Sequence, residues 1–139
     1  MAFNRAVFFV SLLLFGGVQS EERFRGRLSP VPIDATMRAT VTGTGSVSAV
    51  LTGTRLSITG TFDGLGGPAT VARLHQGVAT GVRGPALSEL TVSKSTRGTL
   101  SGTLTLTSEQ ADNLKNGKLY IQIHSEKAPD GNLWGWLLR

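Results

Sequence analysis

The chain has 139 residues, with 14 Lys and Arg against 9 Asp and Glu and a net charge of +5. It has no cysteine, which excludes disulfides and thiolate metal sites, so stability must come from a hydrophobic core. The basic residues are scattered and do not alternate with aromatic ones, which argues against nucleic-acid binding. The positive surplus instead favours acidic partners or an anionic envelope surface.

The first residues, MAFNRAVFFVSLLLFGGVQS, have the anatomy of a secretory signal peptide. Arg5 supplies the positive charge, residues 6–18 form the apolar run, and Ser20 is the small residue at the predicted cut. The run is shorter than the roughly 20 apolar residues that span a membrane. We predict a signal peptide over residues 1–20 and one exported domain over residues 21–139, periplasmic or extracellular. Membrane contact is expected only if the N-terminal segment stays uncleaved.

Short alternating runs of threonine, valine and leucine follow, separated by glycine-rich turns, as in antiparallel strands with one buried face. In RLSITGTF, residues 55–62, apolar side chains alternate with polar ones, and TLSGTLTLT, residues 99–107, repeats the pattern. The other predicted strands are Phe24–Leu28, Ala39–Thr42, Val47–Thr52, Thr70–His75, Ala86–Val92, Lys118–His124 and Leu133–Leu138. About eight or nine short strands predict an all-β fold, an antiparallel Greek-key β-sandwich or barrel.

One short helix is predicted among the strands. Thr107 and Gln110 have the spacing of a capping box, and Gly117 supplies a left-handed stop after Asn116. The helix would cover Ser108–Asn116 and connect two strands.

Several separate motifs, in this order along the chain, resemble the CHRD family, the chordin-type domain. The resemblance runs from about Phe24 to Leu138, and its most specific positions are Gly67, Pro68, Ala69, His75, Gly84, Pro85, Gly117, Tyr120, His124, Pro129, Gly131 and Gly135. It implies an exported all-β domain, found in multidomain extracellular antagonists of growth factors and in many small bacterial exported proteins. For the small exported proteins the resemblance implies little about activity.

The chain departs from the family pattern at two places. Where the family usually has His-x-His, this chain reads Arg73, Leu74 and His75, so the first histidine is missing. Near the end, the usual pattern resembles Gly-Glu-Ile-Arg-Gly-Gln, whereas this chain reads GNLWGW. A basic and a polar position have thereby become Trp134 and Trp136.

The two histidines are candidate metal ligands. If the family motifs converge in space, His75 and His124 would share a copper or zinc ion, with a carboxylate or Tyr120 as third ligand. The guanidinium of Arg73 would repel such a cation from His75. Two other interpretations therefore stay open: Arg73 and His75 bind an anion or carboxylate, or the histidines are strand residues with neighbours as partners.

The tryptophans are candidate anchors for a partner. Trp134 and Trp136 share one strand face, while Leu133 and Leu137 share the other. Because the leucine face serves the core, the tryptophan face is a candidate partner-binding surface. The alternative is that both indoles pack over a neighbouring sheet or under a loop.

Catalysis has little support. The chain has no Gly-x-Ser-x-Gly elbow, no cysteine nucleophile, no phosphate-cradling loop and no His-Glu-x-x-His. We therefore expect a non-enzymatic exported binding module without a cofactor, an accessory subunit that docks on another envelope or extracellular protein through Trp134 and Trp136. The alternative is a copper or other metal-binding protein that uses His75 and His124.

Overall fold

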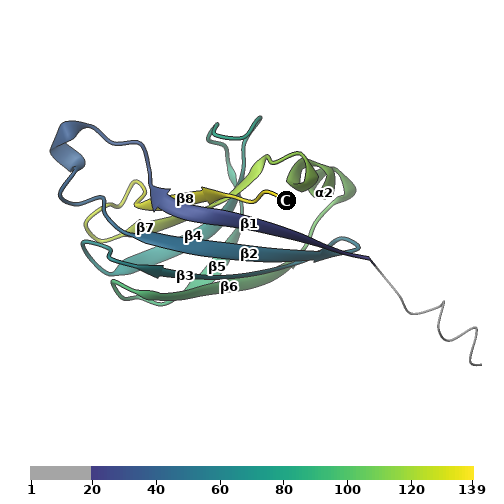
Figure 1. Ribbon diagram of the computed structural model, residues 1–139, viewed down its shortest axis with the longest axis horizontal. Coiled ribbons are helices and arrows are strands. Elements are labelled where there is room, and N and C mark those ends of the chain that lie inside the picture. Colours follow the sequence, from purple (N-terminus) through teal and green to yellow (C-terminus); the bar gives the residue numbers. More distant parts are fainter. Residues whose placement is uncertain (1–19) are drawn as a thin grey trace, which may run out of the picture.

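Eight antiparallel strands close into a barrel in the order β1, β2, β3, β6, β5, β4, β7, β8 (Figure 1). The computed structural model describes residues 20–139, so the predicted signal peptide lies outside the described residues except for Ser20. The elements are β1 (Glu21–Pro30), η1 (Ala35–Met37), β2 (Thr44–Thr52), β3 (Arg55–Asp63), β4 (Ala69–Gln76), β5 (Ala86–Val92), β6 (Gly98–Thr105), α2 (Ser108–Lys115), β7 (Leu119–Ser125) and β8 (Leu133–Trp136). The predicted all-β fold is confirmed, in its barrel form.

The strand order contains a Greek key. Strands β4, β5 and β6 are consecutive neighbours, and β7 returns to lie beside β4. The connection from β6 to β7 runs through α2, which begins at the predicted residue and has the predicted capping box between Thr107 and Gln110. Gly117, with φ at 73°, follows the helix as the left-handed stop. Within the described part of the chain, no helix has the length and apolar content needed to cross a membrane.

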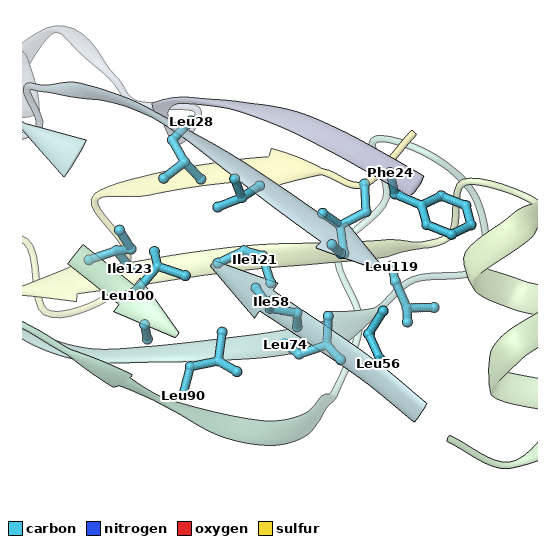
Figure 2. Close-up of a cluster of buried hydrophobic side chains, with 14 of the residues drawn as sticks. Phe24, Leu28, Leu56, Ile58, Leu74, Leu90, Leu100, Leu119, Ile121 and Ile123 are labelled. Atoms are coloured by element: carbon cyan, nitrogen blue, oxygen red, sulfur yellow. The ribbon is translucent and has the colours of Figure 1, made fainter. Parts of the chain in front are cut away.

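The barrel interior holds the apolar side chains that alternation assigns to the buried face. Leu56, Ile58, Leu119, Ile121 and Ile123 are each at most 1% exposed. Figure 2 shows them pointing into the space between the strands. Burial of a side chain of this size contributes about 1.5–3 kcal/mol, so this interior can hold the fold together without disulfides.

The prediction of a strand over Ala39–Thr42 is wrong. This segment forms turns after the short 3-10 helix η1. Asp34 caps η1, because its side chain accepts hydrogen bonds from the backbone N–H groups of Thr36 and Met37 at 3.0 and 3.2 Å. These local hydrogen bonds override the β-forming composition of the segment.

Strands β1 and β8 close the barrel along a narrow seam. They share two ladder pairs at one end and, at the other, reciprocal backbone hydrogen bonds of 2.7 and 2.9 Å between Arg25 and Leu138. Between these points the backbones come close together. A Cβ atom on Gly135 would lie 2.6 Å from the carbonyl oxygen of Arg27, and one on Gly26 would lie 2.5 Å from that of Trp136. Glycine at both positions therefore permits the closure.

We expect Gly135→Ala to lower the free energy of unfolding by about 1–3 kcal/mol, because the added methyl group overlaps the backbone of β1. Chemical denaturation measures the change. Ser29→Ala alters an exposed side chain in the same seam and is the matched control. Equal stability of the two variants would contradict the steric role of Gly135.

Candidate partner-binding site

The outer face of β4, β7 and β8 carries all five site residues that the sequence analysis selects. Arg73 and His75 lie on β4, His124 on β7, and Trp134 and Trp136 on β8. The strand register arranges them with their cross-strand neighbours in three rows: His75–Tyr120–Trp136, Arg73–Gln122–Trp134, and Val71–His124. The two tryptophans share the face away from the core, as alternation predicts.

Four rings on this face form what we call the aromatic cluster, His75, Tyr120, Trp134 and Trp136. The His75 ring stacks on Tyr120 with centroids 4.9 Å apart, and the Trp136 ring is 4.4 Å from Tyr120. Trp134 meets Tyr120 and Trp136 edge to face at 5.8 and 5.9 Å. These separations are favourable for aromatic pairs. Tyr120 at the centre is 1% exposed, whereas both tryptophans keep part of their surface exposed.

The loop of residues 77–85 folds over Tyr120. The Tyr120 hydroxyl accepts a hydrogen bond from the N–H of Gly84 at 3.0 Å and donates one to its carbonyl oxygen at 3.1 Å. His75 Nδ1 donates to the same carbonyl at 2.9 Å. A side chain at position 84 would collide with the carbonyl oxygen of Gln76, so glycine is required for this approach. The face of β7 that alternation assigns to solvent is therefore partly buried.

The same loop brings an additional residue, Arg83, to the cluster. Its guanidinium carbon lies 5.3 Å from the centroid of the Trp134 ring, within cation–π distance. On the sheet side, Trp134 packs against a second small apolar cluster that includes Val31, Val41 and Ala128. Arg83 is not among the residues predicted from sequence, because no local pattern shows that a loop after β4 returns over β8.

The register does not bring His75 and His124 together. His124 pairs with Val71, which precedes His75 by four residues on β4, or about 13 Å along the strand. The row that contains Arg73 and Gln122 lies between the two histidines. This spacing does not support the predicted metal ion shared by both residues.

Each histidine also has partners within the chain. His124 Nδ1 donates to the carbonyl oxygen of Pro129 at 2.8 Å, and its Nε2 accepts from the side-chain amide of Gln122 at 3.2 Å. Residues 20–139 contain no group of three or more His, Cys, Asp or Glu side chains that could hold a metal ion. Copper or other metal binding by His75 and His124 therefore stays a prediction.

Arg73 and His75 remain close enough to act together. They lie two residues apart on one face of β4, about 7 Å along the strand. Arg73 is in register with Glu89 on β5 and Gln122 on β7. Among the described residues, the salt bridges involve only Glu21 and Glu22 as acids, so no salt bridge neutralises Arg73. The geometry is compatible with the predicted anion site.

The surroundings of His75 are electropositive. Burial lowers the pKa of His75 below its ordinary value of 6.5, the hydrogen bond to Gly84 raises it, and the charges of His124, Arg73 and Arg83 lower it further. No carboxylate contributes to the shift. With Nδ1 donating to Gly84, a second proton would go to Nε2, which is buried and has no hydrogen-bond partner among the described residues. The neutral ring is therefore the stable form.

We expect the domain to lose stability as the pH falls from 7.5 to 5.5. Because the pKa of His75 is lower in the folded than in the unfolded chain, the unfolded chain binds the proton first, and stability decreases below about pH 6.5 until the folded pKa is passed. Chemical denaturation at several pH values in this range measures the decrease in the free energy of unfolding. The decrease should be smaller in His75→Gln and unchanged in the control, His124→Gln. An unchanged pH dependence in His75→Gln would contradict this role.

Comparison with known proteins identifies the family. A family model, the CHRD domain, matches residues 27–137, from within β1 to just beyond β8. No curated protein and no solved structure matches the chain. CHRD domains are typically extracellular or periplasmic, and the family is one of non-enzymatic binding domains. The match covers nearly the whole chain and confirms the resemblance that the sequence motifs indicate. The chain therefore belongs to the CHRD domain family.

Proposed function

We propose that this protein is an exported accessory subunit that docks on another envelope or extracellular protein through the outer face of β8. Trp134 and Trp136 act as the anchors. The observation that carries the proposal is the aromatic cluster, in which both indoles are packed in place and still keep part of their surface exposed. CHRD domains are typically extracellular or periplasmic, which supports export of this protein. The predicted signal peptide would direct that export.

The arrangement of the indoles suits a binding surface. Aromatic and arginine side chains are the residues that most often dominate the binding energy of interfaces. Here the rings contact Tyr120 and each other before any partner is present, so little side-chain entropy is lost on binding.

Positive charge flanks the indoles on two sides. Arg83 lies over Trp134. Across the seam, Arg27 stands opposite Trp136, midway between the Arg25–Leu138 and Ser29–Trp134 pairs. An acidic surface would complement these charges, and such complementarity increases the rate and specificity of association. The proposed partner is therefore a protein with an acidic rim around an apolar contact.

We expect Trp136→Ala to weaken the binding of a captured partner about thirtyfold or more, because a tryptophan anchor commonly contributes 2 kcal/mol or more. The tagged exported domain captures partners from envelope and extracellular fractions, and the affinity of each captured protein is then measured with the wild type and the variant. Arg55→Ala, on the exposed face of β3 away from this surface, is the matched control.

Thermal unfolding of each variant separates loss of binding from loss of fold. Trp134→Ala is compared in the same way, since it removes the second anchor. If both tryptophan variants remain folded and bind every captured protein as the wild type does, the docking surface lies elsewhere and the proposal fails.

A second candidate function is the capture of a small anion or carboxylate by Arg73 and His75. It is favoured by the positive charges of Arg73 and Arg83 near His75, and by the absence of a salt bridge to Arg73 among the described residues. The planar fork of an arginine suits carboxylate and phosphate groups.

Titration with inorganic phosphate and with citrate tests the second candidate. We expect a saturable change in tryptophan fluorescence, because the anion would bind beside the Arg73–Gln122–Trp134 row. The change should disappear in Arg73→Ala and persist in Arg55→Ala. The absence of a saturable signal with the wild type, or its persistence in Arg73→Ala, would remove this function.

A further inference from the structure

The large apolar side chains that are exposed in the described residues gather at one place on the molecule. Val78 and Val82, in the loop of residues 77–85, are 77% and 44% exposed, and Leu138, just after β8, is 44% exposed. We call these three residues the apolar tip.

The loop and Leu138 both approach Gly117. The Thr80 Oγ1 atom and the Leu138 Cδ2 atom are 2.8 and 3.0 Å from the point that a Cβ atom on Gly117 would occupy. Figure 1 shows the loop, in teal, rising from the barrel near the carboxyl terminus. Exposed apolar residues from two distant parts of the chain thus lie near one another on the molecule.

Hydrogen bonds hold the tip in this position. The Thr80 hydroxyl donates to the carbonyl oxygen of Gly117 at 2.6 Å, and the N–H of Gly77 donates to that of Lys118 at 2.8 Å. Within the loop, the N–H of Val82 donates to the carbonyl oxygen of Ala79 at 3.1 Å. The valines are therefore displayed by an ordered turn.

Basic residues surround the tip. Arg83 follows Val82 in the loop and is exposed, and Lys118 anchors the base of the loop. Arg25 is exposed and forms the reciprocal backbone hydrogen bonds with Leu138. Residues 77–85 contain no acidic residue.

We propose that the apolar tip docks the protein on an anionic lipid surface. Val78, Val82 and Leu138 enter the boundary between headgroups and acyl chains, while the surrounding basic groups face the lipid phosphates. An apolar projection bordered by Lys and Arg has the composition of interfacial membrane-binding segments. The contact uses other apolar residues than the proposed protein docking at Trp134 and Trp136, and Arg83 borders both.

Size and charge favour a lipid surface over a protein partner at this position. A stable protein interface buries about 800 Å² on each partner, far more than three aliphatic side chains on a convex loop provide. A second copy of the chain would bring the same basic residues against each other, which is unfavourable. Membrane contact is predicted from sequence only through an uncleaved N-terminal segment. Val78, Val82 and Leu138 belong to no continuous apolar run that a hydropathy pattern would reveal.

Site-specific fluorescence tests the proposal, because the chain has no cysteine of its own. Val78→Cys is labelled with an environment-sensitive fluorophore, and Thr59→Cys, exposed on β3, carries the same label as the control. With vesicles of phosphatidylcholine and phosphatidylglycerol we expect a blue shift and an emission increase of about twofold or more at position 78 and no change at position 59. Vesicles of phosphatidylcholine alone should give a much weaker response. The label at position 78 reports only its own surroundings. If the predicted signal peptide is not removed, lipid contact by its apolar run, residues 6–18, therefore does not produce the signal.

Second substitutions in the labelled protein identify the groups involved. Val82→Ser should weaken vesicle binding about tenfold through the lost apolar contact. Arg25→Ser should weaken it about fivefold through the lost charge, and the control Arg55→Ser should leave it unchanged. No response at position 78 to anionic vesicles, or an equal response at position 59, would overturn the proposal. A response at position 78 to an envelope protein fraction but not to lipid would assign the tip to a protein partner and would also overturn it.

Discussion

The hydrogen bonds between the Tyr120 hydroxyl and the backbone of Gly84 organise the outer surface of this barrel. Tyr120 points away from the core, where a bare sheet would leave it in water, yet its ring is buried beneath the loop of residues 77–85. His75 donates to the same carbonyl oxygen and stacks on the same ring. The loop in turn positions Arg83 over Trp134 and displays the apolar tip. Both proposed contacts therefore depend on this attachment of one loop to one strand.

The outward side chains of the barrel differ between the β3–β6 wall and the wall of β4, β7 and β8. On β3 and β6 the outward residues are mostly exposed serine and threonine, such as Ser57, Thr59, Ser101 and Thr103. On β4, β7 and β8 the outward residues instead form a second packed layer over the sheet. Serine and threonine leave their wall fully solvated, whereas the aromatic layer combines partial burial with positive charge. The aromatic cluster therefore gives the wall of β4, β7 and β8 a different chemistry from the wall of β3 and β6.

The two departures from the family pattern meet on this wall. Arg73 and Trp134 are far apart in sequence, but both neighbour Gln122 and lie in one row. In the family pattern that the chain resembles, the basic residue of the row stands at the position of Trp134. In this chain it stands at position 73, where the pattern has a histidine. The row therefore keeps a positive charge while gaining an indole, which changes its chemistry from polar to partly apolar.

Alternation along the chain determines which side chains fill the barrel. Periodicity alone places Ile58, Leu119 and Ile121 in the interior, because a strand directs successive side chains to opposite faces, and all three are buried. The helix ends follow from Thr107 and Gly117, whose roles are local. The strand prediction for Ala39–Thr42 is wrong because the composition of the segment suits a strand, whereas the hydrogen bonds that the Asp34 side chain accepts begin a turn just before it.

What the sequence by itself determined was the fold class, the family, and the face on which each histidine and tryptophan lies, since these depend on residue type and spacing along one strand. Only the tertiary structure decided which of these residues are neighbours. Strand register separates His75 from His124 and joins Arg73 to Gln122 and Trp134, and no local pattern contains that register. The position of the loop over Tyr120 likewise depends on hydrogen bonds between residues 36 positions apart. Contacts over such distances are set by the packing of the whole barrel, so the aromatic cluster and the apolar tip emerge only when the chain is folded.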